Sequence, residues 1–594
     1  MQTRRIKLRF RRRFRKGQKQ VGDLSTQAEQ QIDTHLFKRF GRLSGVRRFI
    51  LAWLGLMLLL MGGVVVQNLA LSNYYQALRT VPGGIYNEGV EGRFTNANPL
   101  FATSNADNTV SRLVFAGLLK YGSDGKLAGD LAKDYQVDER GITYTVHLKK
   151  GLKWQDGQPL TSADVLYTYQ MIQNPDVRSP LQGGWQGIKV SAPDAGTVVF
   201  ELPGPLAAFP NNMTNGIVPK HLLDKIPPAD LRSADFNTVH PVGAGPFAWQ
   251  AVAVKGDSDP RHAQQQIALK AFADYQGGQP KLQKFIVHVY ADEAELTKAF
   301  ESNQLTAAEG LNSIPPELVN NDGVQQHNLP LRAANMVFFK TTSGVLADQA
   351  VRQALVRSAN VPSIVAKLGY PARLVREPIL LGQVAYDKSL AQPGFDLNAA
   401  KTLLDNAGWT ASKEGVRSKA GQPLAFVLTA PDTQEARFVA KQLQAQWRGL
   451  GAKVTVLFLR TSDFQNALTY HSYDAILNGI SIGDDPDVFV YWDSSQADIR
   501  SANRLNLSEY KNPTADSSLE AGRTRSEPKL RVIKYKPFLE EWQKDAPALG
   551  LYQPRVIYLT NGFVNGLSDQ PINTATDRFD NVQNWQIREA KVTN

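Results

Sequence analysis

Cysteine is absent from this chain of 594 residues. Its absence excludes disulfide bridges, a thiol nucleophile and a lipid-modified cysteine as a membrane anchor. The Gly-x-Gly at residues 243–245 runs into Pro246, which is typical of a turn and not of a dinucleotide-binding loop. We therefore expect a binding protein and not an enzyme, with no cofactor.

Metal-ligand patterns are missing too. The eight histidines include no pair at a spacing of three to five residues, which a metal-binding motif would show. The acidic stretch from Asp484 to Asp487 lacks the alternating spacing, the central glycine and the final glutamate of a calcium-binding loop. We expect no metal site.

Net charge is confined to the first 48 residues. They contain 15 of the 67 Lys and Arg residues and 3 of the 55 Asp and Glu residues, so the remaining 546 residues carry 52 groups of each sign. A large domain without net positive charge gives no electrostatic support for nucleic-acid binding. The ten basic residues within 1–19 instead indicate a tail that is attracted to the anionic inner face of a membrane.

One long apolar run, residues 49–66, follows this tail. It has 18 residues without a charge, and the next charged residue after Arg48 is Arg79. At about 1.5 Å of rise per residue, a helix of this length approaches the roughly 30 Å of bilayer hydrocarbon. The Lys and Arg excess before it predicts a basic cytoplasmic tail at 1–48, a signal-anchor helix at 49–72 and an extracytoplasmic domain at 80–594. A signal peptide cleaved after Ser72 is the alternative.

Within the tail, a second apolar pattern has the spacing of a helix. Apolar residues recur every fourth position, at Leu24, Ala28, Ile32, Leu36 and Phe40. They would form one stripe, which predicts an amphipathic helix lying on the membrane or a plain cytoplasmic helix.

Strand and helix patterns alternate through the large domain. Residues 142–148 alternate apolar and polar side chains as a half-buried strand does, and a capping-box pattern from Thr161 to Asp164 opens a helix. Three further helices and a strand are predicted at residues 347–355, 396–407, 436–447 and 453–459, respectively. A domain of about 500 residues exceeds what one hydrophobic core holds, so we expect a mixed α/β protein with two or three cores.

Short sequences spaced along the chain carry a family resemblance. The densest is TVHLKKGLKWQDGQPLTSADV at 145–165, which reads as a strand, an Asp-Gly turn and a helix start. The others are NPL at 98–100, LVFAGLLKY at 113–121, PVGAGPF at 241–247, VRQAL at 351–355, AKTLLDNAGW at 400–409 and YDAIL at 473–477. In this order they resemble the family 5 extracellular solute-binding proteins, the oligopeptide- and dipeptide-binding components of ABC importers.

The resemblance implies a fold and a function. The fold class is α/β, a bilobal periplasmic-binding-protein fold of type II with an extra subdomain, plus one N-terminal transmembrane helix. The first lobe would comprise about 80–330 and 546–594, the extra subdomain about 115–225, and the second lobe about 331–545. The implied function is that of a membrane-tethered protein that captures a peptide between its lobes by hinge closure and delivers it to an ABC permease with its ATPase subunits. We expect a monomer.

The resemblance also implies a ligand site. In peptide-binding relatives an aspartate after the strand that matches 473–477 pairs with the α-amino group of the ligand, because a buried ammonium group needs a partner. Here that loop, residues 479–487, reads GISIGDDPD. Asp484 is the candidate, with Gly479 and Ser481 beside it, although alignment position by position puts Ile482 in its place.

The acidic residues and the tryptophan that follow Asp484 have alternative interpretations. Asp485 and Asp487 are expected to be solvated or to cap the next turn. Trp492 is expected either to offer an aromatic surface to the ligand or to belong to the core.

Other functions stay open at this point. One is a surface peptide receptor or sensor whose basic cytoplasmic tail transmits a signal or localises the protein. Another is a binder of a non-peptide solute, since relatives on this fold also carry nickel complexes, haem and oligosaccharides. The sequence specifies neither the ligand nor the permease.

Overall fold

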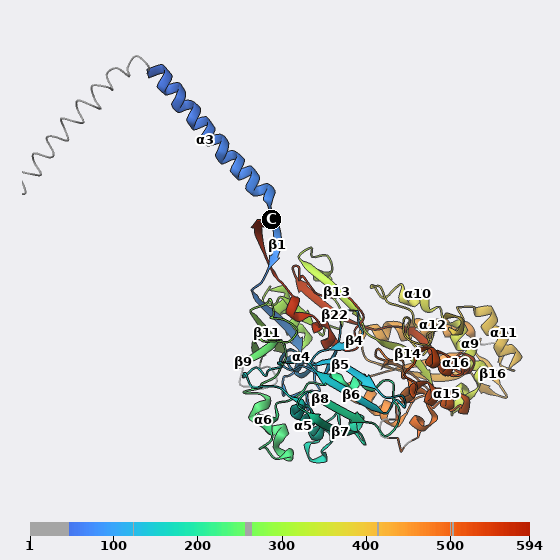
Figure 1. The fold of residues 1–594 in the computed structure, drawn as a ribbon. Coiled ribbons are helices and arrows are strands. Elements are labelled where there is room, and N and C mark those ends of the chain that lie inside the picture. Colours follow the sequence, from blue (N-terminus) through green and yellow to red (C-terminus); the bar gives the residue numbers. More distant parts are fainter. Residues whose placement is uncertain are drawn as a thin grey trace, which may run out of the picture. The chain divides into compact units, whose positions relative to one another are not determined.

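A computed structural model describes residues 47–122, 124–255, 264–412, 415–498, 500–501 and 504–593 (Figure 1). The expected amphipathic helix and nearly all of the basic tail lie outside these residues. The chain forms two compact units, the first made of Met1–Arg79 with Glu589–Asn594 and the second of Thr80–Arg588. We describe each unit by itself.

The first unit is built around one long helix. Helix α3 spans Arg47–Tyr75, and its stretch Phe49–Asn68 has a mean hydropathy of 2.6 with none of its most apolar window buried. Twenty such residues cover about 30 Å as a helix, which is enough to cross a membrane. A signal sequence has the same length and composition, so cleavage after Ser72 stays the alternative. Strand β1 (Gln76–Val81) follows α3 and pairs with the last strand, β23 (Arg588–Thr593).

The second unit is a bilobal α/β structure whose first lobe contains a seven-stranded mixed sheet. The strands follow the order β13-β22-β12-β2-β11-β10-β9, in which β2 is parallel to both β11 and β12 and the other pairs are antiparallel. In sequence order they are β2 (Ile85–Glu91), β9 (Phe247–Lys255), β10 (Gln264–Ala271), β11 (Lys284–Tyr290), β12 (Ala307–Glu309), β13 (Val324–Pro330) and β22 (Arg555–Asn561).

Helices bury both faces of this sheet. Helix α4 (Asn105–Val114) lies on one side, where its Val110, Leu113 and Val114 join the largest core cluster. Helix α7 (Glu293–Glu301) lies on the other side and contributes to a separate core. The first lobe also contains two short helices, α6 (Lys220–Leu223) and α8 (Pro316–Val319).

A separate four-stranded antiparallel sheet is inserted between α4 and β9. Its order is β5-β6-β8-β7, from the strands β5 (Ala132–Val137), β6 (Thr143–Leu148), β7 (Lys189–Asp194) and β8 (Thr197–Glu201). A two-stranded hairpin of β3 (Leu119–Tyr121) and β4 (Leu127–Gly129) precedes it. Helix α5 (Ser162–Gln173) packs on this sheet and begins with the predicted capping box, in which Thr161 and Asp164 bond each other's backbone.

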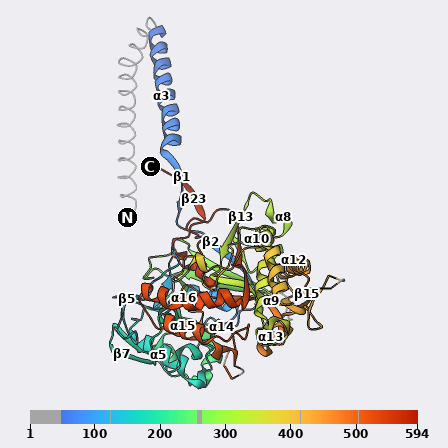
Figure 2. The same ribbon diagram turned by 90° about the vertical axis from the view of Figure 1, so that its right-hand side faces the viewer.

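The second lobe is a five-stranded sheet covered by helices on both faces (Figure 2). Its order is β19-β18-β20-β14-β21, from the strands β14 (Ala333–Phe339), β18 (Ala425–Pro431), β19 (Lys453–Leu459), β20 (Ala475–Ser481) and β21 (Ala548–Tyr552). Alternate residues of β14 enter different cores, Val337 with one set of helices and Met336 and Phe338 with the other. The first set includes α9 (Gln349–Ser358), α10 (Val361–Val365), α11 (Leu397–Asn406) and α12 (Gln434–Leu450). The second includes α14 (Phe489–Trp492), α15 (Pro513–Arg523) and α16 (Pro528–Asp545).

These elements confirm the local predictions. The predicted helices at 347–355, 396–407 and 436–447 are α9, α11 and α12, and the predicted strands are β6 and β19. The ends of these five elements differ from the predictions by at most three residues. Asp396 caps α11 by accepting a hydrogen bond from the Ala399 amide, as an N-terminal aspartate does.

The chain passes twice between the two large sheets. It leaves the first lobe between β13 and β14, at Leu331 and Arg332, and returns between β21 and β22, at Gln553 and Pro554. The two crossings are bonded to each other, since the Leu331 amide donates to the Pro554 carbonyl at 2.9 Å. We call residues 80–331 and 553–588 the first lobe and residues 332–552 the second lobe.

Candidate ligand-binding site

The predicted ligand loop begins at the end of β20, where one edge of this strand has no neighbour. Strand β14 pairs with β20 along its whole length, whereas β18 pairs only with Ala475 and Ile476. Gly479 and Ser481 lie beyond that point and are exposed, and their carbonyls accept hydrogen bonds from the Asn478 side chain at 2.9 Å and from the Tyr491 hydroxyl at 2.6 Å. A strand end with one open edge can accept an extended peptide as an additional strand.

Asp484 is held by an arginine at the crossing between the lobes. Its Oδ1 accepts a hydrogen bond from Arg332 Nη1 at 2.7 Å, and the same Nη1 donates to the Gly125 carbonyl in the β3–β4 hairpin of the first lobe. The Asp484 side chain is 33% exposed, and no hydrogen bond to its Oδ2 occurs among the described residues. Burial raises the pKa of the Asp484 carboxyl, and Arg332 opposes this rise. One oxygen of Asp484 is thus available to a ligand, and the other is occupied.

Asp485 and Asp487 are neither solvated nor free, so the expectation of solvation is wrong. Asp485 forms a two-pronged pair with Arg531 at 2.6 Å for each contact, and Asp487 accepts from Arg523 at 3.0 Å. The two aspartate side chains are 15% and 13% exposed. Asp487 also accepts from the Phe489 amide at 3.4 Å, in line with the expected turn cap. Arginines of α15 and α16 therefore neutralise this part of the loop.

Trp492 lies in the interior of the second lobe. It has no exposed surface, stacks on Phe338 with ring centroids 5.7 Å apart, and meets Trp542 edge to face at 5.6 Å. Of its two expected roles, this placement corresponds to the core role, because a ligand does not reach the ring.

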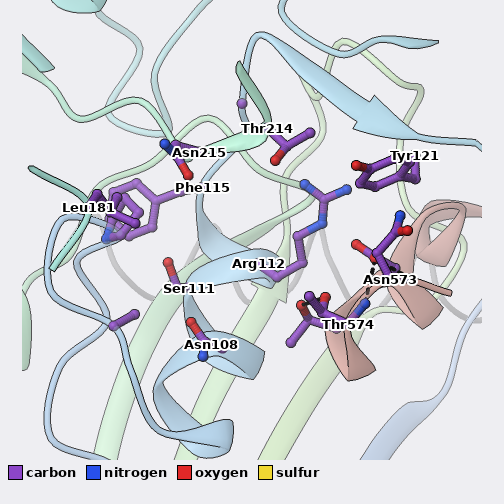
Figure 3. Close-up of a pocket in the computed structure, with 16 residues that line it drawn as sticks. Asn108, Ser111, Arg112, Phe115, Tyr121, Leu181, Thr214, Asn215, Asn573 and Thr574 are labelled. Atoms are coloured by element: carbon purple, nitrogen blue, oxygen red, sulfur yellow. Dashed lines mark hydrogen bonds between the residues drawn. The ribbon is translucent and has the colours of Figure 1, made fainter. Parts of the chain in front are cut away.

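A pocket of about 290 Å³ opens on the first lobe (Figure 3). This volume is close to the lower end of the range of about 300–1,000 Å³ that is typical of ligand pockets. Its walls come from α4, the loop at 214–216 and the segment at 573–577, which starts the short helix Ala575–Phe579. Most of the side chains that line it are polar, among them Asn108, Ser111, Tyr121, Thr214, Asn215 and Asn573.

This pocket adjoins the acidic loop of the second lobe. Asn573 lines the pocket, and its Oδ1 lies 4.0 Å from the position that a Cβ on Gly483 would occupy. Burial raises the pKa of the Tyr121 hydroxyl on the pocket wall, and the charges of Asp577 and Asp484 add to this rise. The buried Asn573 Oδ1 has no hydrogen-bond partner among the described residues. A buried acceptor without a partner thus lies close to Gly483, the residue before Asp484.

Arg112 is the one cationic side chain among the residues that line the pocket. It extends from α4 toward Thr214, Tyr121 and Asn573 (Figure 3). Its helix is fixed at the C-terminal end by Gln155, whose amide donates to the Val114 carbonyl at 3.0 Å. A Cβ at Gly243 or Gly245 would collide with that same carbonyl, so both positions of the Gly-x-Gly require glycine where the chain passes against α4. Sequence reasoning missed Arg112, although it is the only Lys or Arg between Arg93 and Lys120.

No cluster of three or more His, Cys, Asp or Glu side chains suited to a metal ion occurs among the described residues. The acidic loop is satisfied by arginines rather than arranged around a cation. The polar pocket and the open strand edge are instead suited to an organic solute with hydrogen-bonding groups.

Comparison with known proteins identifies the family. Residues 126–501 match the bacterial extracellular solute-binding proteins, family 5. The chain belongs to this family. Protein XP55 of Streptomyces lividans is 29% identical over 461 residues, which cover 75% of this chain and 79% of that protein. The oligopeptide-binding protein AppA of Bacillus subtilis is 26% identical over 495 residues, which cover 80% and 86% of the two chains.

Solved structures agree with the bilobal fold. AppA from Bacillus subtilis, in complex with a nonapeptide, has a TM-score of 0.66 and 24% identity, with coverage of 86% of this chain and 100% of that chain. NikZ from Campylobacter jejuni, in complex with Ni(L-His), has a TM-score of 0.69 and 24% identity, with coverage of 85% and 99%. These likenesses establish the fold, and the different ligands of the two neighbours leave the choice of ligand to the residues of this chain.

Membership in the solute-binding family determines the broad role of the large domain. It is an extracytoplasmic binding domain of the kind that serves ABC importers, and the family consists of binding proteins and not of enzymes. The polar pocket, the open edge of β20 and the half-exposed Asp484 are the features of this chain through which binding can be argued further.

Proposed function

We propose that this protein captures peptides between its two lobes and delivers them to an ABC permease while α3 tethers it to the cell membrane. The observation that carries the proposal is the juxtaposition of a polar pocket on the first lobe with the open edge of β20 and with Asp484 on the second. A peptide laid along Gly479 and Ser481 would bond the backbone of that edge irrespective of its side chains, and it would replace the Tyr491 hydroxyl at the Ser481 carbonyl.

In this proposal Asp484 binds the α-amino group of the peptide. Its Oδ1 stays with Arg332, and its Oδ2 accepts from the ammonium group. Because Arg332 also contacts Gly125 in the first lobe, occupation of Asp484 would act on a residue that contacts both lobes. The proposal places Trp492 behind the site as support and not in contact with the ligand.

Native mass spectrometry tests peptide capture. The full-length protein is purified in detergent from cells grown on a peptide-rich medium. We expect a heterogeneous bound mass that fragments into short peptides and that decreases in Asp484→Ala. The matched control is Asp322→Ala, which removes an exposed carboxylate before β13 and should leave the bound mass unchanged. A single non-peptide adduct that is unaffected by Asp484→Ala would contradict the proposal and favour another solute, such as a nickel complex, haem or an oligosaccharide.

The tether can be tested by labelling, because the chain has no cysteine of its own. Single cysteines are introduced as Ser25→Cys in the tail and as Ser313→Cys on the exposed surface of the first lobe. In intact cells a membrane-impermeant maleimide should label only Ser313→Cys, and both variants should react after lysis. Labelling of Ser25→Cys in intact cells would contradict a cytoplasmic tail, and loss of residues 1–72 from the mature protein would favour a cleaved signal peptide.

Delivery to a permease is tested by uptake. Deletion of the protein should abolish uptake of a radiolabelled peptide that it binds, and the Asp484→Ala variant should reduce uptake in proportion to its loss of binding.

The basic tail favours a second candidate, a peptide sensor. Ten basic residues within 1–19 provide a surface for a cytoplasmic partner. Under this alternative, deletion of residues 1–19 would abolish a transcriptional response to peptide and leave uptake intact. Under the transport proposal, the same deletion changes neither peptide uptake nor transcription.

A further inference from the structure

The guanidinium group of Arg112 is the one charged group of the pocket wall that the protein leaves unpaired. No hydrogen bond or ion pair to it occurs among the residues that the structure describes between 47 and 593, and its side chain extends into the pocket (Figure 3). Arginines elsewhere near the lobe boundary, Arg332, Arg523 and Arg531, each bind an aspartate. An arginine is always charged, and a partly buried one without a partner gives up hydration for no protein contact.

The nearby carboxylates form no ion pair with Arg112 among the described residues. Asp577 shares the pocket, but its Oδ2 accepts the backbone amides of Asn573 and Thr574 at 3.1 and 2.9 Å, and no ion pair joins it to Arg112. Burial raises the pKa of Asp580 to about 6, and the charge of Arg112 opposes this rise, but no ion pair joins the two side chains among the described residues. The guanidinium group of Arg112 therefore keeps N–H donors that no described side chain accepts.

The geometry around Arg112 suits a planar anion. The guanidinium plane offers parallel N–H donors, which match the two oxygens of a carboxylate. Polar side chains surround the place to which it points, namely Thr214, Tyr121 and Asn573 (Figure 3). Among the described residues that line this wall, the Asn573 side chain carries an acceptor oxygen that is buried and without a partner.

We infer that Arg112 binds a carboxylate of the captured ligand, so that the protein selects solutes with a free carboxylate over neutral analogues. This inference rests on the proposed capture of ligands at the lobe boundary and assigns their chemical class. The carboxylate would come from the C-terminus of a peptide or from an acidic side chain, and both present the same group to Arg112.

The test compares how tightly three matched sets of alanine-based peptides, two to nine residues long, bind to the full-length protein in detergent. One set has a free C-terminal carboxylate, one is C-terminally amidated, and one is amidated but contains a glutamate. Binding is measured by native mass spectrometry and by titration calorimetry. We expect the wild type to bind the free-acid set, the glutamate set or both at least about tenfold more tightly than the neutral amides, in keeping with a charge-assisted hydrogen bond.

Substitution of Arg112 separates this role from a structural one. Arg112→Gln should abolish the preference for carboxylates and leave the affinity for neutral amides unchanged, and Arg112→Lys should restore part of the preference because it keeps the charge but not the fork. The control Arg140→Gln removes an exposed arginine of the inserted sheet and should preserve the preference. Unchanged affinity for the amides reports that Arg112→Gln is folded.

The outcomes distinguish the two proposals. Peptide binding without a carboxylate preference, or a preference that survives in Arg112→Gln, would overturn the role of Arg112 and leave peptide capture standing. Failure of the wild type to bind any of the three sets would overturn both. A preference for the free-acid set alone identifies the C-terminus as the source of the carboxylate, and a preference for the glutamate set identifies the side chain.

Discussion

The two charged regions at the lobe boundary differ in how their charges are satisfied. The acidic loop of the second lobe has three aspartates, and each is paired with an arginine, whereas Arg112 in the first-lobe pocket has no partner among the described residues. A pair that is satisfied within the protein fixes a loop, and an unsatisfied group is available for a ligand. The difference indicates that most of the acidic loop is architecture, and that binding contacts are to be sought at Arg112 and at the free oxygen of Asp484.

The pair of Asp485 with Arg531 should contribute most to the stability of the acidic loop. We expect Asp485→Ala to lower the free energy of unfolding by about 3 kcal/mol, because it leaves Arg531 buried without its counter-ion. The measurement is urea denaturation followed by tryptophan fluorescence, to which four second-lobe tryptophans contribute: Trp409, Trp447, Trp492 and Trp542.

Two further variants make the Asp485 test specific. The control Asp498→Ala removes an exposed partner of Arg500 and should have no measurable effect. The double variant Asp485→Ala/Arg531→Met should recover much of the stability, since no unpaired charge remains. An equal response of Asp485→Ala and Asp498→Ala would show that the loop is not held by its pairs.

Glu377 differs from the aspartates of the acidic loop, because it is buried in the second lobe and forms no ion pair among the described residues. Burial raises its pKa from 4.5 to about 7. In the unfolded chain it ionises above about pH 4.5, while the folded protein keeps its proton up to about pH 7, so ionisation opposes folding increasingly between these values. We expect Glu377→Gln to raise the free energy of unfolding by about 2 kcal/mol at pH 8.

The pH dependence decides whether this explanation holds. Stability of the wild type relative to Glu377→Gln should rise as the pH falls from 7 toward 4.5, and the difference should be small below that value. Urea midpoints of both proteins at several pH values measure it. A difference that does not vary with pH would mean that the substitution acts through packing.

The smallest expected effect concerns Asp484 and the ligand. Asp484→Asn should weaken binding of peptides with a free α-amino group about tenfold and leave N-acetylated peptides unaffected, since only the former bring an ammonium group. Because burial raises the pKa of Asp484, wild-type affinity should fall on acidification at a higher pH than an ordinary aspartate would give. Calorimetry with both peptide forms measures this, with Asp322→Asn as the control. Equal losses for both forms would assign Asp484 to structure, like its neighbours.

The sequence predicted features that depend on neighbours along the chain. The capping box at Thr161, the aspartate cap at Asp396 and the strand at 453–459 each follow from residues within one or two turns. The partners of the acidic loop could not be predicted in this way. Arg332 is separated from Asp484 by 152 positions, and Arg531 from Asp485 by 46, so only the folded sheet and helices bring them together.

The pocket was unpredictable for a related reason. It is assembled from α4, the loop at 214–216 and the segment at 573–577, three regions that meet only in the folded first lobe. Arg112 follows Ser111 on a helix whose apolar pattern gives no sign that one polar position faces a cavity. Trp492 was a candidate ligand contact with the core as the alternative, and its complete burial corresponds to the alternative, as is usual for large aromatic side chains.

The paired crossings between the lobes have a mechanical consequence. The Leu331 amide and the Pro554 carbonyl join the two connections into a narrow ribbon, and such a ribbon bends across its thin direction more easily than it shears. We therefore expect opening and closing of the lobes to be mainly a rotation about this ribbon. Because the chain has no native cysteine, one spin label can be attached to each lobe through an introduced cysteine. The distance between the two labels should then take two values, one for the open and one for the closed form, and ligand should shift the population from the first to the second.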